Sequence, residues 1–281
     1  MEADLSPAGT GTLYVVSTPI GHMGDFSFRA VETLRSVSAV LAEDTRHSVH
    51  LLKRYEVTTP LVAYHEHNEA KATPALVARL VAGESLALVS DAGTPLLSDP
   101  GGRLVQAAVA AGVPVVPVPG ASALLAALVA SGLDVERFTF FGFLPRKGAE
   151  LRELLGELTL SRHTAVLYEA PSRVADTLAE LARAGAGERR AAVARELTKQ
   201  FEETRRGTVA ELAAYYVDAP PRGEVVIVIA GAAAPAGASE DVLRGRAAEL
   251  RAEGRSARDV AAALVTELGA PRNLAYRLAH E

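Results

Sequence analysis

One stretch, residues 86–102 (LALVSDAGTPLLSDPGG), constrains the fold of this chain more than any other. Four apolar residues end abruptly at Ser90 and Asp91, and Gly, Pro and Asp dominate the rest of the stretch. This profile is typical of a buried parallel strand that runs into a polar loop at its carboxyl end, where open α/β sheets bind ligands. An ordinary connection needs one Gly or Pro, whereas residues 91–102 contain two Pro, three Gly and two Asp. The stretch therefore predicts an α/β fold with a binding site in this loop, which also carries Thr94, Ser98 and Asp99.

Apolar, β-rich runs alternate with helical patterns through the first part of the chain, which predicts a doubly wound, mostly parallel sheet. The expected strands are 12–17, 38–42, 61–64, 86–89 and 113–118, and the expected helices are 29–36, one through 51–52, 72–81 and 101–111. A hinge rich in Pro and small residues, 117–123, opens the second part. Its expected strands are 137–143, 164–168, 191–194 and 224–230, and its expected helices are 124–130, 151–160, one through 178–181 and a short one within 207–216.

These patterns predict two α/β domains, 1–118 and 119–232, and a C-terminal segment, 233–281. Residues 231–239 (GAAAPAGAS) have the composition of a linker. The expected helices after it are 241–252, 256–268 and 271–278, with Ser256 as a cap and Gly269 as a stop.

Composition limits the function. The chain has 281 residues, 49% of them hydrophobic, and a net charge of −5, so any nucleic-acid contact must come from a local basic patch. The absence of cysteine excludes a disulfide scaffold, thiolate catalysis and Cys-ligated zinc. No apolar run approaches the roughly 20 residues that span a bilayer, and the first residues lack the pattern of a secretory signal. We expect a soluble, cytoplasmic protein without a membrane partner.

Charged residues come directly after the predicted strands. In EDTRH after strand 38–42, a helix cap at Asp44 or Thr45 explains one acid and leaves Glu43, Arg46 and His47 without a structural role. In HEHNE after strand 61–64, two His two residues apart without a third ligand are poorly spaced for a metal, so we expect none. Comparable clusters occur at 146–148, 169–173 and 195–203.

The chain resembles the tetrapyrrole methylase superfamily in nine segments that occur in the same order. They are LYVVSTPIGHMGD, LAEDTRHSVHLL, YHEHNE, LVSDAGTPLLSDPG, VPVPGASALLAAL, FFGFLPRKG, LYEAPSR, RELTKQFEE and GEVVIVIAG. Within the superfamily it is similar to the bacterial branch that methylates the ribose 2′-hydroxyl of a cytidine in 16S rRNA, at family position 1402. Gly-Thr-Pro at 93–95 replaces the Gly-Asp-Pro typical of tetrapyrrole enzymes. His22 stands where the branch usually carries Asn.

The resemblance implies two α/β domains with S-adenosylmethionine in the cleft between them, a homodimer, and the small ribosomal subunit with its 16S rRNA as partner, with no role for DNA. The charged loops all come after strands and would face this cleft. The implied cofactor contacts are Pro19, Asp91, Gly93, Thr94, Leu97, Ser122, Ala123, Tyr168, Glu169 and Leu197.

A ribose hydroxyl is a weak nucleophile, so methyl transfer to it benefits from a base or from a cation that stabilises the alkoxide. The candidates for that role are Glu43, Asp91, Glu169 and Lys199, and the sequence does not select among them. The candidate contacts to RNA are Arg46, His47, Arg146, Lys147 and Arg173.

Two alternatives remain open. The first is methylation of a tetrapyrrole or another small substrate, which the charges of EDTRH, YHEHNE and RKG disfavour because they suit phosphates. The second is a non-catalytic RNA-binding protein on the same fold, which the intact loop 91–101 disfavours.

Overall fold

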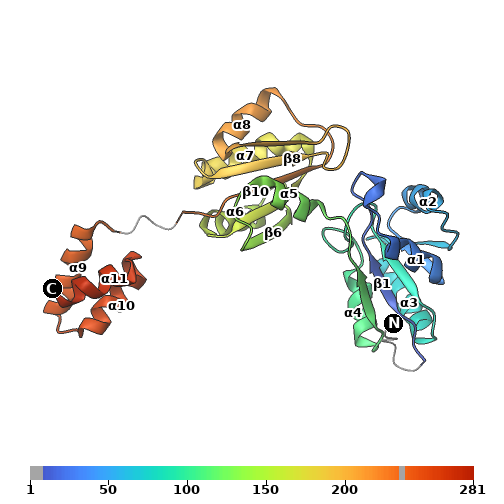
Figure 1. Cartoon of the computed structure of the whole chain (residues 1–281), viewed down its shortest axis with the longest axis horizontal. Coiled ribbons are helices and arrows are strands. Elements are labelled where there is room, and N and C mark those ends of the chain that lie inside the picture. Colours follow the sequence, from blue (N-terminus) through green and yellow to red (C-terminus); the bar gives the residue numbers. More distant parts are fainter. Residues whose placement is uncertain (1–8, 234–237) are drawn as a thin grey trace. The chain divides into compact units, whose positions relative to one another are not determined.

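The computed structural model describes residues 9–233 and 238–281 (Figure 1). The part of the predicted linker at 234–237 lies outside the described residues. The chain divides into two compact units, one containing 9–159 and 163–230 and the other 160–162 with 231–281. Among the described residues, the first unit contains two β-sheets and the second contains three helices. The domain boundaries at 118 and 232 stay predictions.

The first sheet has the strand order β3-β2-β4-β1-β5, and every neighbouring pair is parallel. Its strands are β1 (Leu13–Val16), β2 (Ala39–Ala42), β3 (Leu61–Ala63), β4 (Leu86–Val89) and β5 (Val115–Val118). The helices between them are α1 (Phe28–Ser36), α2 (Thr45–Arg54), α3 (Glu69–Val81) and α4 (Gly102–Ala110). This confirms the predicted α/β class and the alternation of strands and helices.

Strand β4 lies at the centre of this sheet, and all four of its residues are buried. Leu86 and Leu88 belong to one hydrophobic cluster, and Ala87 and Val89 belong to another. Because neighbouring side chains of a strand point to opposite faces, the apolar run supplies both faces of the sheet. The site loop therefore begins from a strand that is packed firmly on both sides.

The second sheet has the order β6-β7-β10-β8-β9 and mixed directions. Its strands are β6 (Phe138–Phe143), β7 (Thr164–Glu169), β8 (Arg190–Arg195), β9 (Glu203–Thr208) and β10 (Val225–Ile229). Only β6 and β7 are parallel, whereas β10 runs antiparallel to both β7 and β8. Strand β9, which pairs with β8, was not predicted, because its sequence ETRRGT lacks apolar alternation.

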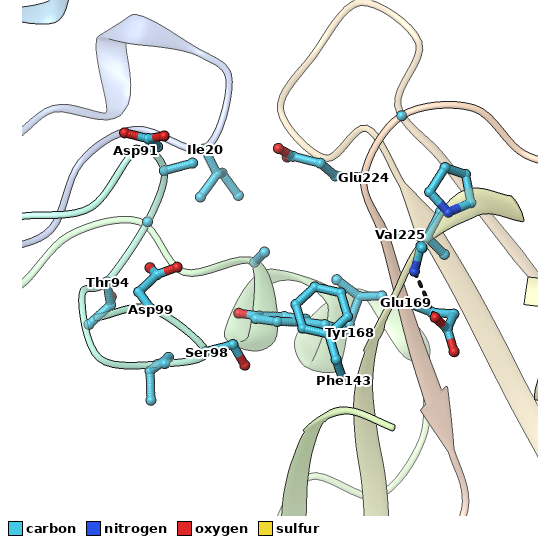
Figure 2. A pocket seen from close by; sticks show the side chains of 18 residues that line it. Ile20, Asp91, Thr94, Ser98, Asp99, Phe143, Tyr168, Glu169, Glu224 and Val225 are labelled. Carbon is cyan, nitrogen blue, oxygen red and sulfur yellow. Dashed lines mark hydrogen bonds between the residues drawn. The ribbon is translucent and has the colours of Figure 1, made fainter. Parts of the chain in front are cut away.

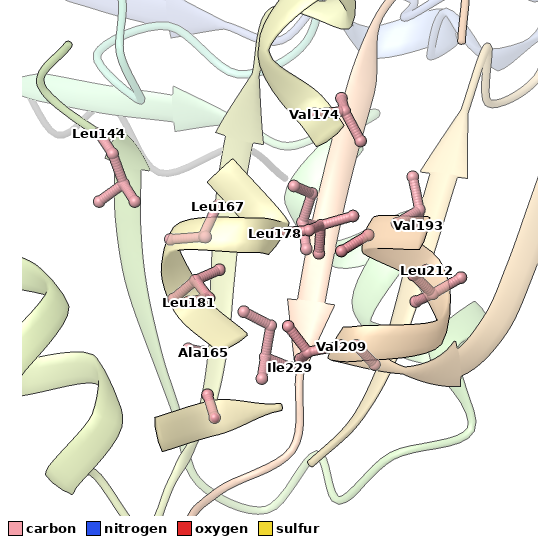
Figure 3. Close-up of a cluster of buried hydrophobic side chains, with 14 of the residues drawn as sticks. Leu144, Ala165, Leu167, Val174, Leu178, Leu181, Val193, Val209, Leu212 and Ile229 are labelled. Atoms are coloured by element: carbon pink, nitrogen blue, oxygen red, sulfur yellow. The ribbon is translucent and has the colours of Figure 1, made fainter. Parts of the chain in front are cut away.

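Helices cover the faces of the second sheet. They are α5 (Ala123–Ser131), α6 (Ala149–Leu160), α7 (Val174–Leu181) and α8 (Val209–Asp218), with short helical turns at Pro171–Arg173 and Ala182–Ala186. Figure 3 shows the core between this sheet and α7 and α8, where Leu167, Leu178 and Ile229 are fully buried. On the other face, Leu124 and Leu128 of α5 pack with Val226 and Val228 of β10.

The C-terminal unit has a hydrophobic core of its own. It contains α9 (Glu240–Ala252), α10 (Ala257–Leu268) and α11 (Arg272–His280). Leu250, Val260, Leu264 and Leu278 are fully buried in it. Ser256 caps α10, and Gly269, in the left-handed region at φ 64°, ends it as predicted. Among the described residues, no helix is long and apolar enough to cross a bilayer.

Candidate active site

The loop after β4 is fastened to the neighbouring segments by short hydrogen bonds. Thr18 and Gly93 exchange backbone hydrogen bonds of 2.8 and 3.1 Å. The Thr94 hydroxyl donates to the carbonyl of Ala121 at 3.1 Å and lies 3.0 Å from the hydroxyl of Ser17. Thr94 therefore joins this loop to the end of β1 and to the hinge before α5.

Two loops of this region contain residues in the left-handed backbone region without being glycine. Leu96 and Ser98, with φ of 75° and 71°, belong to the loop after β4, and Glu196 and Thr198, with φ of 51° and 64°, come after β8. Each such residue costs on the order of 1–3 kcal/mol, and such strain is concentrated at functional sites. The two strained loops are therefore candidate parts of a site.

A cavity of about 440 Å³ lies beside these loops (Figure 2). It is lined by Ile20, Asp91, Ala92, Gly93, Thr94, Leu97, Ser98, Asp99, Ala123, Phe143, Tyr168, Glu169, Ala170, Pro171, Gly223, Glu224, Val225 and Val226, and we call it the acidic cavity. Four of these residues are carboxylates, and none of the described lining residues is Lys, Arg or His. The cavity thus combines apolar walls with an excess of acidic side chains.

Two carboxylates of this region have raised pKa values. Burial raises the pKa of Asp99, and the neighbouring Asp91 raises it further, against a hydrogen bond from Ser90. Burial also raises the pKa of Glu43, with Asp99 and Asp91 as the largest contributing charges. Like charges held close together in a partly buried place disfavour their own ionisation, so a bound cation would be stabilised there.

Glu169 is held by its own loop. Its side chain is 1% exposed and accepts hydrogen bonds from the amide of Ala170 at 2.8 Å and from the hydroxyl of Thr177 at 2.6 Å. The Arg173 guanidinium lies 3.3 Å from the same carboxylate and donates to the Leu144 carbonyl at 2.9 Å. These contacts fix the loop after β7 against the end of β6.

Tyr168 gives the acidic cavity an aromatic wall. Its ring lies edge-to-face with Phe140 and Phe143, at centroid distances of 4.9 and 5.6 Å. Burial raises the pKa of the Tyr168 hydroxyl, so the side chain stays neutral at physiological pH. Figure 2 shows Tyr168 and Phe143 on one side of the cavity and Asp91 and Asp99 on another.

A second cavity, of about 220 Å³, adjoins the first. It is lined by Thr18, Pro19, Ile20, Gly21, Met23, His47, His50, Leu51, Asp91, Ala92, Lys199 and Glu224, and we call it the basic cavity. It shares four lining residues with the acidic cavity, namely Ile20, Asp91, Ala92 and Glu224. Its basic residues, His47, His50 and Lys199, are absent from the described lining of the acidic cavity, and its two acids are shared ones.

Lys199 forms ion pairs with Glu196 at 2.9 Å and with Glu224 at 3.0 Å, and its side chain is 29% exposed. Burial lowers the pKa of Lys199, but these ion pairs outweigh burial and hold the pKa above its ordinary value. Lys199 is therefore a fixed cation rather than a base. Gly21 packs so closely on Lys199 and Thr198 that a Cβ would overlap them, and the His22 amide donates to the Thr198 hydroxyl at 3.0 Å.

The structure brings most of the predicted residues to these two cavities. The acidic cavity contains Asp91, Gly93, Thr94, Leu97, Ala123, Tyr168 and Glu169, and the basic cavity contains Pro19, His47, Asp91 and Lys199. Glu43 lines neither cavity but lies close enough to Asp91 and Asp99 to interact electrostatically with them. Ser122 caps α5, and Leu197 is buried against α5 and the second sheet.

The predicted RNA contacts lie mostly outside the cavities. Arg146 and Lys147 are exposed in the loop after β6, and Arg173 is held by Glu169 and the Leu144 carbonyl. The expectation that Arg46 has no structural role is wrong. Its guanidinium, 89% exposed, pairs with the carboxylate of the Asp44 cap at 2.7 Å, and its backbone amide donates to the same carboxylate at 2.8 Å.

Sequence reasoning missed Glu224, which lines both cavities. Site residues were predicted directly after the strands, whereas Glu224 comes directly before β10. Because β10 runs antiparallel to β7 and β8, its first residue, Val225, pairs with Glu169 and Arg195 at their carboxyl ends. The charge-dense PPRGE before the apolar run was the available indication. His50 was also missed, since it lies in the middle of α2, where polar residues usually face solvent.

Known proteins share this architecture and sequence. The family model of tetrapyrrole (corrin/porphyrin) methylases matches residues 12–213. A protein of Synechocystis sp. named ribosomal RNA small subunit methyltransferase I is 46% identical over 273 residues, which cover 96% of this chain and 98% of that protein. A protein of Pseudomonas aeruginosa with the same name is 50% identical over 229 residues, 81% of each chain.

Solved structures agree at the level of the fold. Uroporphyrin-III C-methyltransferase of Thermus thermophilus, complexed with S-adenosylhomocysteine, superposes with a TM-score of 0.57 at 21% identity, covering 78% of this chain and 97% of that one. A diphthine synthase superposes with a TM-score of 0.58 at 15% identity, covering 78% and 89%. The matched family model covers most of the chain, and relatives align with it along nearly its whole length. This chain therefore belongs to the tetrapyrrole methylase family.

Proposed function

We propose that the chain transfers a methyl group from S-adenosylmethionine to the ribose 2′-hydroxyl of a cytidine in 16S rRNA, at family position 1402. The family is one of methylases, and relatives with 46–50% identity are named as methyltransferases of small-subunit rRNA. The choice of hydroxyl and nucleotide rests on the motif resemblance in the sequence.

The charge of the acidic cavity is the observation that carries the proposal. Four carboxylates and no described Lys, Arg or His line it; Glu169 and Glu224 are paired with Arg173 and Lys199, and Asp91 and Asp99 favour a ligand with a positive charge. Leu97, Tyr168 and Val226 supply apolar surface of the kind that a nucleoside needs. The residues thus fit S-adenosylmethionine, which supplies a methyl group activated by the positive charge of its sulfur. Asp91 and Asp99 would favour that charge, and Thr94, Leu97, Ala123 and Tyr168 would hold the rest.

The proton of the ribose hydroxyl must be accepted by a residue of this chain or by water. Lys199 is a cation and does not accept it, and Glu169 is engaged with Thr177, Ala170 and Arg173. Asp91 and Glu224 both line the two cavities, and Glu224 is paired with Lys199, so we assign Asp91 as the group that receives the proton. Lys199 is placed to stabilise the oxygen as its charge develops. Glu43 reinforces the negative potential of the acidic cavity.

Several expectations belong to this proposal as well. We propose that the chain acts in the cytoplasm, as a homodimer, on small ribosomal subunits. Arg46, Arg146 and Lys147 are exposed and would contact RNA phosphates outside the cavities. Domains at 1–118 and 119–232 would each supply one sheet, and the segment 233–281 would come after them.

Methyl transfer with labelled S-adenosylmethionine tests the proposal. The substrate is small ribosomal subunits that lack their native modifications, and the modified nucleotide is mapped by mass spectrometry. We expect ribose methylation at one cytidine and a loss of about 100-fold or more in kcat/KM for Asp91→Asn, as for removal of a group that acts on the reacting atoms. Asp176→Asn is the matched control, because Asp176 is exposed on α7 and lines neither cavity.

Two outcomes contradict the proposal in different ways. Cofactor binding without transfer to any RNA would favour a small substrate, and tetrapyrroles would then be tested as acceptors. Absence of cofactor binding, measured by calorimetry with S-adenosylhomocysteine, would exclude methyl transfer altogether and favour an RNA-binding protein without catalysis.

A further inference from the structure

The two adjoining cavities share Asp91 and Glu224 but differ in their other ionisable side chains, so they suit different ligands. The three basic side chains of the pair, His47, His50 and Lys199, all lie in the smaller cavity. The basic cavity adds N–H donors to the carboxylates that the two cavities share, whereas every described charged side chain that lines the acidic cavity is a carboxylate, so a phosphate-bearing ligand finds partners in the basic cavity. The acidic cavity thus suits a cation, and the basic cavity suits a nucleotide.

The basic cavity is placed so that a ligand bound in it can contact a ligand bound in the acidic cavity. Ile20, Asp91, Ala92 and Glu224 line both, so the two volumes meet at these residues. Asp91 accepts a hydrogen bond from the Asp44 amide at 3.2 Å, which joins the loop after β4 to the start of α2. Helix α2 in turn carries His47 and His50.

The size of the basic cavity limits what enters it. About 220 Å³ is half the volume of the acidic cavity and is too small for a stacked base pair. Enzymes that modify a nucleotide inside structured nucleic acid turn it out of the stack into a fitted pocket. RNA recognition likewise relies on single bases that are splayed out and contacted along their edges.

We propose that the basic cavity binds the single nucleotide that is methylated, turned out of its RNA, and that His50 is a residue that positions it. The inference rests on the proposed function and names the subsite where its acceptor lies. His50 and His47 contact the nucleotide through ring nitrogens, and Met23 and Leu51 contact its apolar surface. Lys199, paired with the shared Glu224, faces the hydroxyl.

Placing a negative charge at His50 tests the inference. His50→Glu in the full chain is compared with Lys53→Glu, a control on the same helix whose exposed side chain lines neither cavity. We expect His50→Glu to raise the KM for unmodified small subunits about tenfold or more, since a lost contact to a charged group is worth about 1.5–3 kcal/mol. Binding of S-adenosylhomocysteine should stay unchanged, and Lys53→Glu should change KM by less than about threefold.

A crosslink locates the nucleotide directly. Small subunits carrying 5-iodocytidine at the mapped position are irradiated with the protein, and the crosslinked peptide is identified by mass spectrometry. We expect peptides from 18–25 or from α2. Crosslinks confined to 145–148 or to the C-terminal unit would overturn the inference, as would equal effects of His50→Glu and Lys53→Glu, which would indicate general attraction of RNA.

The failure of the inference is distinguishable from that of the proposed function. If the wild-type chain methylates no RNA, the proposed function fails and the subsite falls with it. If the wild-type chain methylates one cytidine but His50→Glu keeps the wild-type KM, only the subsite is wrong.

Discussion

The acidic and basic cavities share four lining residues, yet one contains no described basic side chain and the other contains three. The difference arises from which loops each cavity uses. The acidic cavity is lined mainly by the loops after β4 and β7 and by the start of β10, whereas the basic cavity adds α2, the loop after β1 and Lys199 from the loop after β8. Adjacent cavities that share Asp91 and Glu224 but differ in their other ionisable side chains can favour different ligands side by side. Single substitutions should test this difference between the two cavities.

The largest effect is expected from removing the fixed cation of the basic cavity. Under the proposed mechanism, Lys199→Met should lower kcat about 100-fold or more, because it deletes the charge assigned to the developing alkoxide and leaves Glu196 and Glu224 without their ion pair. Lys199→Arg should restore part of the rate. Single-turnover methyl transfer measures both variants, and a loss confined to cofactor binding would contradict this role for Lys199.

A structural effect of about 2–3 kcal/mol is expected from Gly101→Ala, at the end of the loop that forms the acidic cavity. The glycine has φ 129°, and a Cβ would lie 2.5 Å from Leu88 Cδ2. Gly112→Ala is the matched control, since Gly112 also has a positive φ, 71°, but nothing within 4 Å of the added atom. Thermal unfolding should show a clearly larger loss of stability for Gly101→Ala, and equal losses would rule out the close packing on Leu88.

A loss of about 1–3 kcal/mol is expected from Thr177→Val, which removes the 2.6 Å hydrogen bond to the buried carboxylate of Glu169. The substitution keeps the shape of the side chain and leaves a carboxylate oxygen without its donor. Chemical denaturation measures the loss. Unchanged stability would mean that Glu169 is available for chemistry and would return it to the set of candidate bases.

The smallest effect is expected from Asp99→Asn, which tests the negative charge of the acidic cavity. Because burial and Asp91 raise the pKa of Asp99 in the folded state, its ionised form opposes folding at neutral pH. Asp99→Asn should therefore gain stability, on the order of 1 kcal/mol or less, at pH 7. The gain should vanish as the pH falls through the raised pKa and below the unfolded-state value.

Asp99→Asn should stabilise the fold but weaken the binding of the cofactor, so binding is measured as well. It should weaken the binding of the positively charged S-adenosylmethionine more than that of the neutral S-adenosylhomocysteine. Calorimetry with both ligands measures the difference. Equal weakening would mean that the carboxylate contributes a contact rather than a charge.

The first sheet could be predicted from the sequence almost completely, because each apolar run is short and is succeeded by a helical pattern. Parallel strands joined by helices leave few alternative topologies. The loop after β4 was recognised for the same reason, since Gly, Pro and Asp come directly after a buried strand. The start of α3 was missed by three residues: Asn68 accepts a hydrogen bond from the His65 amide, so the polar cluster there begins a helix.

The second sheet was less predictable, and the physical reason lies in its mixed directions. Strand β9 has a charged sequence, and its pairing partner is β8 alone, so it carries no apolar pattern of its own. Glu224 lies at the site because β10 runs antiparallel to β7. A local pattern of residues does not determine the direction of a strand. The role of Lys199 as a cation likewise depends on Glu196 and Glu224, which only the tertiary fold brings to it.

The strained residues of the two site loops have a consequence for anyone who wishes to make this protein more robust. Glycine at Leu96, Ser98, Glu196 or Thr198 would relieve an unfavourable backbone conformation, so these positions are natural targets for thermostabilisation. Yet Ser98 lines the acidic cavity, and Glu196 pairs with Lys199 of the basic cavity, so side chains that glycine would delete also contribute to the two cavities. In this chain, substitutions that raise stability and substitutions that preserve turnover therefore compete for the same four positions.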